Sequence, residues 1–181
     1  MALRSTVFRA EVGISDLDRQ YYQTHTLTLA RHPSETDERM MVRLLAFIMN
    51  ASETLEFGRG ISSEDEPALW DRDLTGSILH WIEVGQPDER LLRRACGRAD
   101  KVSVYAYGRA QDQWWQQNAA ALNKLGKLTV WTLSADDCNA LVALVERGMD
   151  LQCTIQDGQA MISAESEVVQ VEPQRLTQER G

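Results

Sequence analysis

Two stretches of the chain carry residue types that could hold a divalent cation. Glu83 interrupts the otherwise apolar run ILHWIEV at residues 78–84, and Asp65 and Glu66 lie in the acidic stretch SSEDEP at residues 62–67. A carboxylate inside an apolar strand is costly to bury unless it is protonated, paired or bound to a cation. Carboxylate oxygens suit Mg²⁺ and Mn²⁺, and such an ion could activate a water against a phosphodiester. The alternative for Glu83 is an ion pair with an arginine of the following helix, and for the acidic stretch a solvated surface loop.

Arginines follow Glu83 at a spacing that places them on one side of the expected helix. Arg90, Arg94 and Arg98 recur every four residues, and Arg93 is adjacent. Guanidinium groups can bind phosphate through two parallel hydrogen bonds, so this side of the helix could face a phosphate-bearing ligand. The alternative is an exposed helix face on which the arginines pair with the acidic residues at positions 88 and 89.

Composition and missing motifs exclude several function classes. The chain has 181 residues, a net charge of −8 and three cysteines without a CxxC pair, and its pI is near 4.9. This charge disfavours a sequence-independent nucleic-acid binder, and the cysteine spacing disfavours a zinc knuckle or a disulfide framework. GxSxG, HExxH, GxxxxGK[ST] and GxGxxG motifs are absent. Since no apolar run approaches the ~20 residues of a membrane span, we expect a cytoplasmic protein without a membrane partner.

The elements that must position these residues follow from hydrophobic periodicity. Residues 5–14 and 21–29 alternate as an antiparallel strand pair does, and a helix is expected after Ser34. Short strands are expected at residues 55–60 and 68–74. Strands at 77–86, 101–107 and 128–133 are separated by helical patterns, which predicts parallel β-α-β units. Alternating runs around Asp157-Gly158 predict a C-terminal hairpin.

This order of elements predicts an α/β (α+β) protein with a central mixed sheet flanked by helices. We expect a single domain over residues 1–181, because no linker, repeat or low-complexity tract interrupts the chain. The last residues, 172–181, are polar and are expected to be disordered.

Long stretches of the sequence resemble the YaeQ family of bacterial proteins. They are LTLARHPSETDERMMVRLLAFI, EDEPALW, WIEVGQPDERLLRRA, QWWQQN and LQCTIQDG. The resemblance extends from the first residue to about residue 169. It implies a variant of the PD-(D/E)XK nuclease fold, with a restriction-endonuclease-like core at about residues 34–133 and with acidic residues gathered at a Mg²⁺ site.

The resemblance also implies roles for individual residues. The (D/E)-x-K motif falls on Glu83-Val84-Gly85, and the upstream acidic position falls on Asp65-Glu66-Pro67. An acidic residue of the first core helix matches Glu38. The ligands expected for Mg²⁺, or for Mn²⁺ in its place, are therefore Glu38, Asp65, Glu66 and Glu83.

The motif departs from the family pattern at Gly85, which stands where the lysine should be. That lysine is expected to orient the attacking water and to stabilise developing negative charge. Its loss either removes catalysis or requires a substitute, and Arg94 or Arg90 on the next helix could supply the positive charge.

Two functions are consistent with these residues. The first is a Mg²⁺-dependent nuclease, with Asp65, Glu83 and Arg94 as catalytic residues and with Arg90, Arg93 and Arg98 contacting nucleic acid. The second is a nuclease-like domain that has lost its chemistry and serves as a binding or regulatory module, for which a protein partner is an option. The acidic charge and the missing lysine favour the second, whereas a retained, buried Glu83 with Asp65 nearby favours the first.

Overall fold

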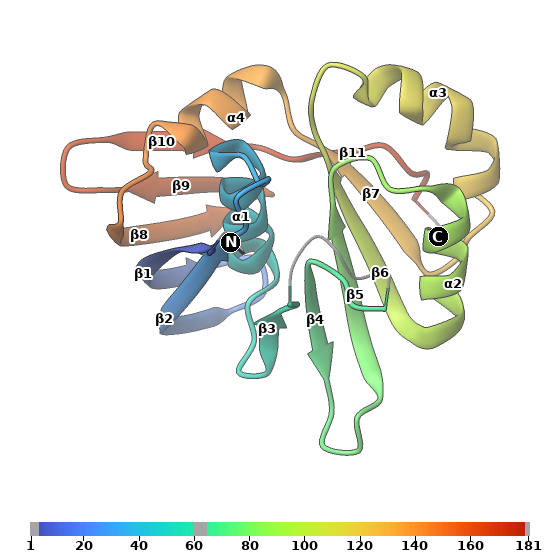
Figure 1. Ribbon diagram of the computed structural model, residues 1–181, viewed down its shortest axis with the longest axis horizontal. Helices are drawn as coiled ribbons and strands as arrows, with labels where there is room; N and C mark the ends of the chain where they lie inside the picture. The colour runs from blue at the N-terminus through green and yellow to red at the C-terminus, as the bar shows by residue number, and fades with distance from the viewer. Residues whose placement is uncertain (1–3, 60–64, 180–181) are drawn as a thin grey trace. The chain divides into compact units, whose positions relative to one another are not determined.

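The computed structural model describes residues 4–59 and 65–179 (Figure 1). Its residues divide into two compact units, each built around its own sheet. Unit 1 comprises Met1–Asn50 and Asp136–Glu172, and unit 2 comprises Ala51–Ala135 and Pro173–Gly181. The sequence predicts a single domain because it contains no linker composition. The chain passes from one unit to the other three times, and no linker-like segment marks these points. The division into units therefore cannot be recognised from the composition.

Unit 1 contains a five-stranded mixed sheet in the order β10-β9-β8-β1-β2. Its strands are β1 (Thr6–Asp16), β2 (Tyr21–Arg31), β8 (Gly148–Gln156), β9 (Gln159–Ser163) and β10 (Val168–Val171). The antiparallel pairing of β1 with β2 and the β8–β9 hairpin confirm the two strand pairs expected from the sequence. The hairpin turns at Asp157 and Gly158, whose φ values of 53° and 75° fit a two-residue turn. Strand β8 also pairs in parallel with β1, which joins the two pairs into one sheet.

Helix α1 (Asp37–Asn50) supplies much of the core of unit 1. It lies against β1 and β2, and every residue of α1 from Met40 to Ile48 is buried. Thr36 rather than Ser34 caps this helix, because the amide of Arg39 donates to Thr36 Oγ1 at 3.1 Å. The second helix, α4 (Ala135–Val142), buries Cys138 and Leu141.

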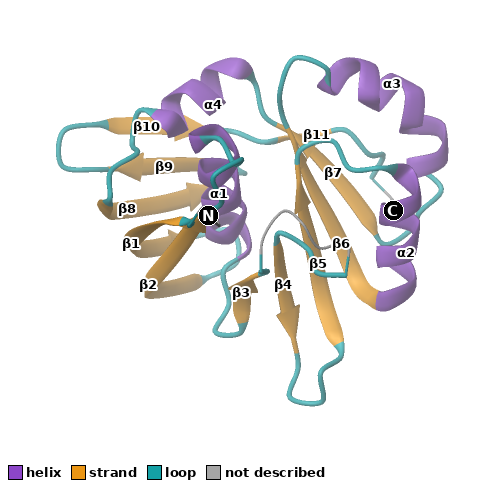
Figure 2. Cartoon of the chain, in the orientation of Figure 1, coloured by secondary structure: helices purple, strands orange, loops and turns teal. Residues whose placement is uncertain are grey.

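Unit 2 contains a six-stranded sheet in the order β11-β7-β6-β5-β4-β3. Its strands are β3 (Leu55–Phe57), β4 (Leu69–Arg72), β5 (Ile78–Val84), β6 (Ala99–Ala106), β7 (Leu128–Thr132) and β11 (Gln174–Arg175). Strands β5, β6 and β7 are parallel, which confirms the two β-α-β units. Helices α2 (Glu89–Arg98) and α3 (Gln111–Leu122) lie on one face of this sheet (Figure 2). A shared hydrophobic cluster joins residues of both helices, such as Leu92 and Leu122, to Trp81, Val102 and Val130 of the sheet.

The end of the chain differs from the disordered tail expected over residues 172–181. Strand β11 pairs antiparallel with β7, and the amide of Leu176 donates to the carbonyl of Val130 at 2.8 Å. The amide of Val130 in turn donates to Thr177 Oγ1 at 3.3 Å, and Thr177 is buried. The sequence does not indicate this segment because β11 has only two residues, too few to show strand alternation. The segment's one large apolar side chain, Leu176, packs against a cluster whose residues lie far away in the sequence. Residues 180–181 lie outside the described residues.

The fold is therefore the mixed α+β class expected from the sequence, with two mixed sheets and four helices in the described part of the chain. The arrangement of strands differs from the expectation in one respect. The N-terminal strand pair and the C-terminal hairpin combine into a sheet of their own, and the β-α-β units form the other sheet. The parallel β1–β8 pairing responsible for this joins residues about 140 positions apart, which local periodicity cannot reveal.

Candidate functional site

Glu83 lies near the carboxyl end of β5, one residue before the strand ends at Val84. Because alternate residues of a strand point to the same face, Glu83 and Trp81 share the face that packs against α2. The indole Nε1 of Trp81 donates to Glu83 Oε1 at 2.9 Å. Trp81 is 1% exposed whereas Glu83 is half-buried. The carboxylate thus lies at the margin of the core, where a hydrogen bond to the indole holds it in place.

Two arginines of α2 connect this strand to Asp65. The Arg98 guanidinium lies 5.0 Å from the centroid of the Trp81 ring, and its Nη1 donates to the backbone carbonyl of Asp65 at 3.3 Å. Arg94 Nη2 is 3.9 Å from Asp65 Oδ1, with side-chain exposures of 55% and 85%. An ion pair this exposed contributes little to stability. The structure therefore links Asp65 to Glu83 through Arg98 and Trp81, and the contact of Asp65 with Arg94 lies in solvent.

The other two expected metal ligands are placed differently. Glu66 accepts a hydrogen bond from the amide of Arg59 at 2.9 Å and lies 3.6 Å from Arg59 Nε. Glu38 belongs to α1 of unit 1, whereas Asp65, Glu66 and Glu83 belong to unit 2. Residues 62–64 of the acidic stretch lie outside the described residues. Within the described residues, no group of three or more His, Cys, Asp or Glu side chains could hold a metal ion. The donor types suit Mg²⁺, but the described side chains do not gather into a site of that size.

The remaining arginines of α2, Arg90 and Arg93, lie on its solvent-exposed side. Arg93 forms an ion pair with Glu89 one turn earlier in the helix, which matches the solvated-face alternative for this residue. The amide of Arg90 donates to the Asp88 side chain at 2.7 Å, so Asp88 is the N-cap of α2. The Arg90 side chain is exposed. The outer surface of α2 therefore carries four arginines, of which Arg94 and Arg98 lie toward Asp65.

Gly85, which stands where the resemblance leads us to expect a lysine, follows the end of β5 and has φ of +96°. Its amide donates to the carbonyl of Tyr105 at 2.9 Å. The atom nearest to a Cβ built on this residue, apart from its chain neighbours, would be Tyr107 Cε1 at 4.0 Å, so there is room for a side chain. The constraint is the backbone, because L-residues rarely adopt this φ. Position 85 therefore does not continue the strand on which the (D/E)-x-K spacing depends.

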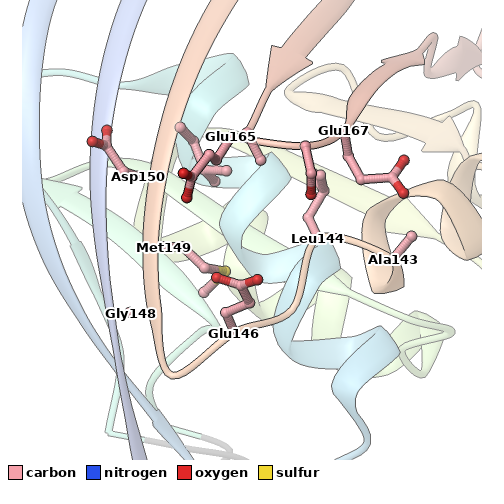
Figure 3. Close-up of a pocket in the computed structure, with 11 residues that line it drawn as sticks. Ala143, Leu144, Glu146, Gly148, Met149, Asp150, Glu165 and Glu167 are labelled. Atoms are coloured by element: carbon pink, nitrogen blue, oxygen red, sulfur yellow. The ribbon is translucent and has the colours of Figure 1, made fainter.

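A pocket of about 140 Å³ in unit 1 is a feature that the sequence did not indicate (Figure 3). Its lining includes four carboxylates, Glu146, Asp150, Glu165 and Glu167. They come from β8, from the residues just before it and from the turn between β9 and β10, so no local spacing links them. All four side chains are exposed.

Comparison with known proteins assigns the family. The family model described as YaeQ protein matches residues 1–173. The chain belongs to the YaeQ family. A YaeQ protein of Salmonella typhi is 48% identical over 164 residues, which cover 90% of this chain and 91% of the relative. The YaeQ protein of Escherichia coli K12 is 44% identical over 172 residues, covering 94% and 95%. Both relatives are named as uncharacterised proteins, so they support the family and not an activity.

Two crystal structures of YaeQ proteins share this fold. The Xanthomonas axonopodis pv. citri protein is 49% identical, with a TM-score of 0.92 over 96% of this chain and 98% of its own. The Pseudomonas syringae protein is 39% identical, with a TM-score of 0.91 over 98% of each chain. No helix among the described residues is both long enough and apolar enough to cross a membrane.

Proposed function

We propose that this YaeQ-family chain is a nuclease-like binding module that takes up a phosphate-bearing ligand, of the kind a nucleic-acid backbone presents, along α2. The observation that carries the proposal is the position of Arg98, over the Trp81 ring beside Glu83 and bonded to the Asp65 carbonyl. The ring and the carbonyl hold the guanidinium group in place, and its remaining N–H groups can donate to an anion. Arg90 and Arg94 extend the positive surface along the same helix, in a chain whose net charge is −8.

Binding is better supported than hydrolysis for two reasons. The described residues contain no group of three ligands for a metal ion. The position of the motif lysine is taken by Gly85, whose φ of +96° is unsuited to a lysine. Arg94 could supply a positive charge in its place, but it lies on a helix and 3.9 Å from an exposed carboxylate, where solvent weakens electrostatic stabilisation.

A Mg²⁺-dependent nuclease is the second candidate, and the location of Glu83 favours it. Parallel α/β sheets bind ligands at the carboxyl ends of their strands, and Glu83 lies at that end of β5. Mg²⁺ often uses only one or two carboxylates and completes its shell with waters and phosphate oxygens. On this reading Glu83 and Asp65 would hold the ion, which when bound would activate a water. Arg94 would supply positive charge near the phosphate.

Binding and cleavage assays separate the two candidates. Fluorescence anisotropy with labelled single-stranded DNA, double-stranded DNA and RNA should show binding, weakened at least tenfold in Arg94→Gln/Arg98→Gln. The control Arg9→Gln changes an exposed arginine of β1 in unit 1 and should bind as the wild type does. If none of the three nucleic acids binds at low salt, the nucleic-acid proposal is wrong.

Cleavage is then followed with the same substrates and with Mg²⁺ or Mn²⁺, alongside calorimetric titration of each metal. Intact substrates support the binding module. Metal-dependent cleavage that is lost in Glu83→Gln but kept in Glu11→Gln, a matched change on an exposed strand residue of unit 1, would establish the nuclease instead.

A further inference from the structure

Strand β2 forms an unusually long edge. The sheet edges in the described part of the chain are β2 and β10 in unit 1, and β3 and β11 in unit 2. Strand β2 has eleven residues, whereas β10 has four, β3 has three and β11 has two. Natural proteins commonly keep edge strands short, because an edge presents unpaired backbone groups that attract another strand. Three of the four edges follow this rule, and β2 does not.

Several sequence and register devices that protect an edge are also missing from β2. Its sequence, YYQTHTLTLAR, contains no proline, glycine or lysine, and its only fully charged residue is Arg31 at the end. The register with β1 runs without a shift from Asp16↔Tyr21 to Thr6↔Arg31, so no bulge turns the edge away. By contrast, the pairing of β4 with β5 contains a register shift between Asp71 and Arg72.

The side chains of β2 suit pairing with another strand. Tyr22, Thr24, Thr26, Thr28 and Ala30 are all exposed and alternate along one face, with Tyr22 at 61%. Threonine and tyrosine are residues that favour strands. The strand contains no acidic residue, although the chain carries a net charge of −8. Two copies can therefore bring this segment together without the carboxylate repulsion that opposes contact elsewhere on their surfaces.

We propose that β2 pairs antiparallel with β2 of a second copy of this chain, around a two-fold axis at Thr26. A two-fold contact places the same strand on both sides of the interface, and centring it on Thr26 uses all eleven residues. Thr26 then faces its own counterpart, Thr24 faces Thr28, and Tyr22 faces Ala30. The two five-stranded sheets join into one continuous sheet.

The position of Arg31 favours a second copy over an unrelated peptide as the partner. In this register Arg31 of each copy lies opposite Tyr21 of the other, so the only fully charged residue of the strand meets an aromatic ring at both ends of the interface. Cations and aromatic rings attract one another. Within its own chain Arg31 forms an ion pair with Asp37 and lies 5.2 Å from the centroid of Phe8, and Arg19 lies 5.3 Å from the centroid of Tyr21, so the contact across the interface would add to these interactions. An interface of one strand from each copy is small, so the dimer should be reversible and dependent on concentration.

The proposal is tested by introducing charged residues at Thr26, which lies on the two-fold axis. Sedimentation equilibrium should show wild-type dimers that dissociate on dilution. Thr26→Lys and Thr26→Glu each place two like charges opposite one another and should each weaken dimerisation at least tenfold. An equimolar mixture of the two variants should recover a dimer, because Lys then faces Glu. The control is Thr154→Lys, which changes an exposed threonine of β8, a strand paired on both sides with β1 and β9. It should dimerise as the wild type does.

Three outcomes would overturn the proposal. They are a wild-type protein that stays monomeric at the highest soluble concentration, Thr26 variants that dimerise normally, and a Thr154→Lys variant as impaired as Thr26→Lys, which would place the contact on the sheet face. Circular dichroism establishes that each variant is folded. Hydrogen exchange on the wild type provides a measurement without substitution, since the β2 amides directed away from β1 should become protected only at concentrations where the dimer forms.

Discussion

Replacing Gly85 with lysine restores the (D/E)-x-K sequence and tests whether the backbone at residue 85 accommodates a lysine. The φ of +96° at this residue is a conformation that costs an L-residue about 1–2 kcal/mol. Steric conflict adds little, because the nearest neighbour to a built Cβ is Tyr107 Cε1 at 4.0 Å. We therefore expect Gly85→Lys to lower the free energy of unfolding by about 1–2 kcal/mol. For a chain of this length that corresponds to a drop in Tm of about 2–8 °C.

Tryptophan fluorescence during urea unfolding measures this effect in the right part of the chain. All five tryptophans, at positions 70, 81, 114, 115 and 131, lie in unit 2 together with Gly85. Gly85→Asn should cost less than Gly85→Lys, because asparagine tolerates positive φ better than other L-residues.

The matched control is Gly97→Ala in α2, where a built Cβ meets nothing within 4 Å. Since glycine is worse than alanine in a helix by roughly 0.5–1 kcal/mol, this change should stabilise unit 2 slightly. If Gly85→Lys unfolds at the wild-type urea concentration, the backbone at residue 85 imposes no cost on an L-residue. If Gly85→Lys gains Mg²⁺-dependent cleavage that Gly85→Asn lacks, position 85 acts as the motif residue despite its backbone.

Four further predictions concern stability and reactivity. Arg43→Met should lower the free energy of unfolding by about 3 kcal/mol, because Arg43 bonds both oxygens of the buried Glu35 carboxylate at 2.6 and 2.9 Å. A second arginine, Arg39, still contacts that carboxylate in the variant. Urea unfolding followed by far-UV circular dichroism measures the change, and a much smaller decrease would show that the Arg43–Glu35 ion pair contributes little. Burial raises the pKa of both Cys138 and Cys153 to about 12, so at pH 8.5 both thiols should react with Ellman's reagent far more slowly than in guanidinium chloride. The native state keeps these protons while the unfolded chain loses them, so stability should fall as pH rises above about 8.5; a flat pH profile between 8 and 10 would contradict this. Ending the chain at Glu172 removes β11 and should lower the urea midpoint of the tryptophan transition, and an unchanged midpoint would show that β11 adds no stability.

The sequence predicts local elements well because each depends on nearby residues. Alternation located β1 and β2, and the Asp157-Gly158 pair located the β8–β9 hairpin. Both β-α-β units follow from a helix-length spacing between apolar strands. The sequence could not predict which strands meet across the chain, since β1–β8 and β7–β11 pair through backbone groups that every residue type possesses.

In the candidate site, too, features that depend on neighbouring residues were predictable, whereas contacts between distant residues were not. The position of Glu83 near the end of a parallel strand was predictable from the apolar run around it. The link from Glu83 through Trp81 and Arg98 to Asp65 was not, because it joins β5, α2 and a loop. The prediction that Glu38 is a metal ligand beside Glu83 assumes that both residues belong to one core. In the structure they belong to different units.

Gly85 shows how the (D/E)-x-K spacing expected from the resemblance can lack the geometry of that motif. In a continuing strand, residues 83 and 85 point to the same face, and this shared face lets the acidic residue and the lysine of (D/E)-x-K act on one phosphate. Here β5 ends at Val84, and a positive φ redirects the chain at the next residue. If a residue other than glycine stood at position 85 within an intact strand, a single substitution to lysine would restore the motif. Gly85 instead has a positive φ at which a lysine is strained, so a lysine here destabilises the fold. We therefore expect any positive charge near Glu83 to come from another element, and α2 supplies arginines there.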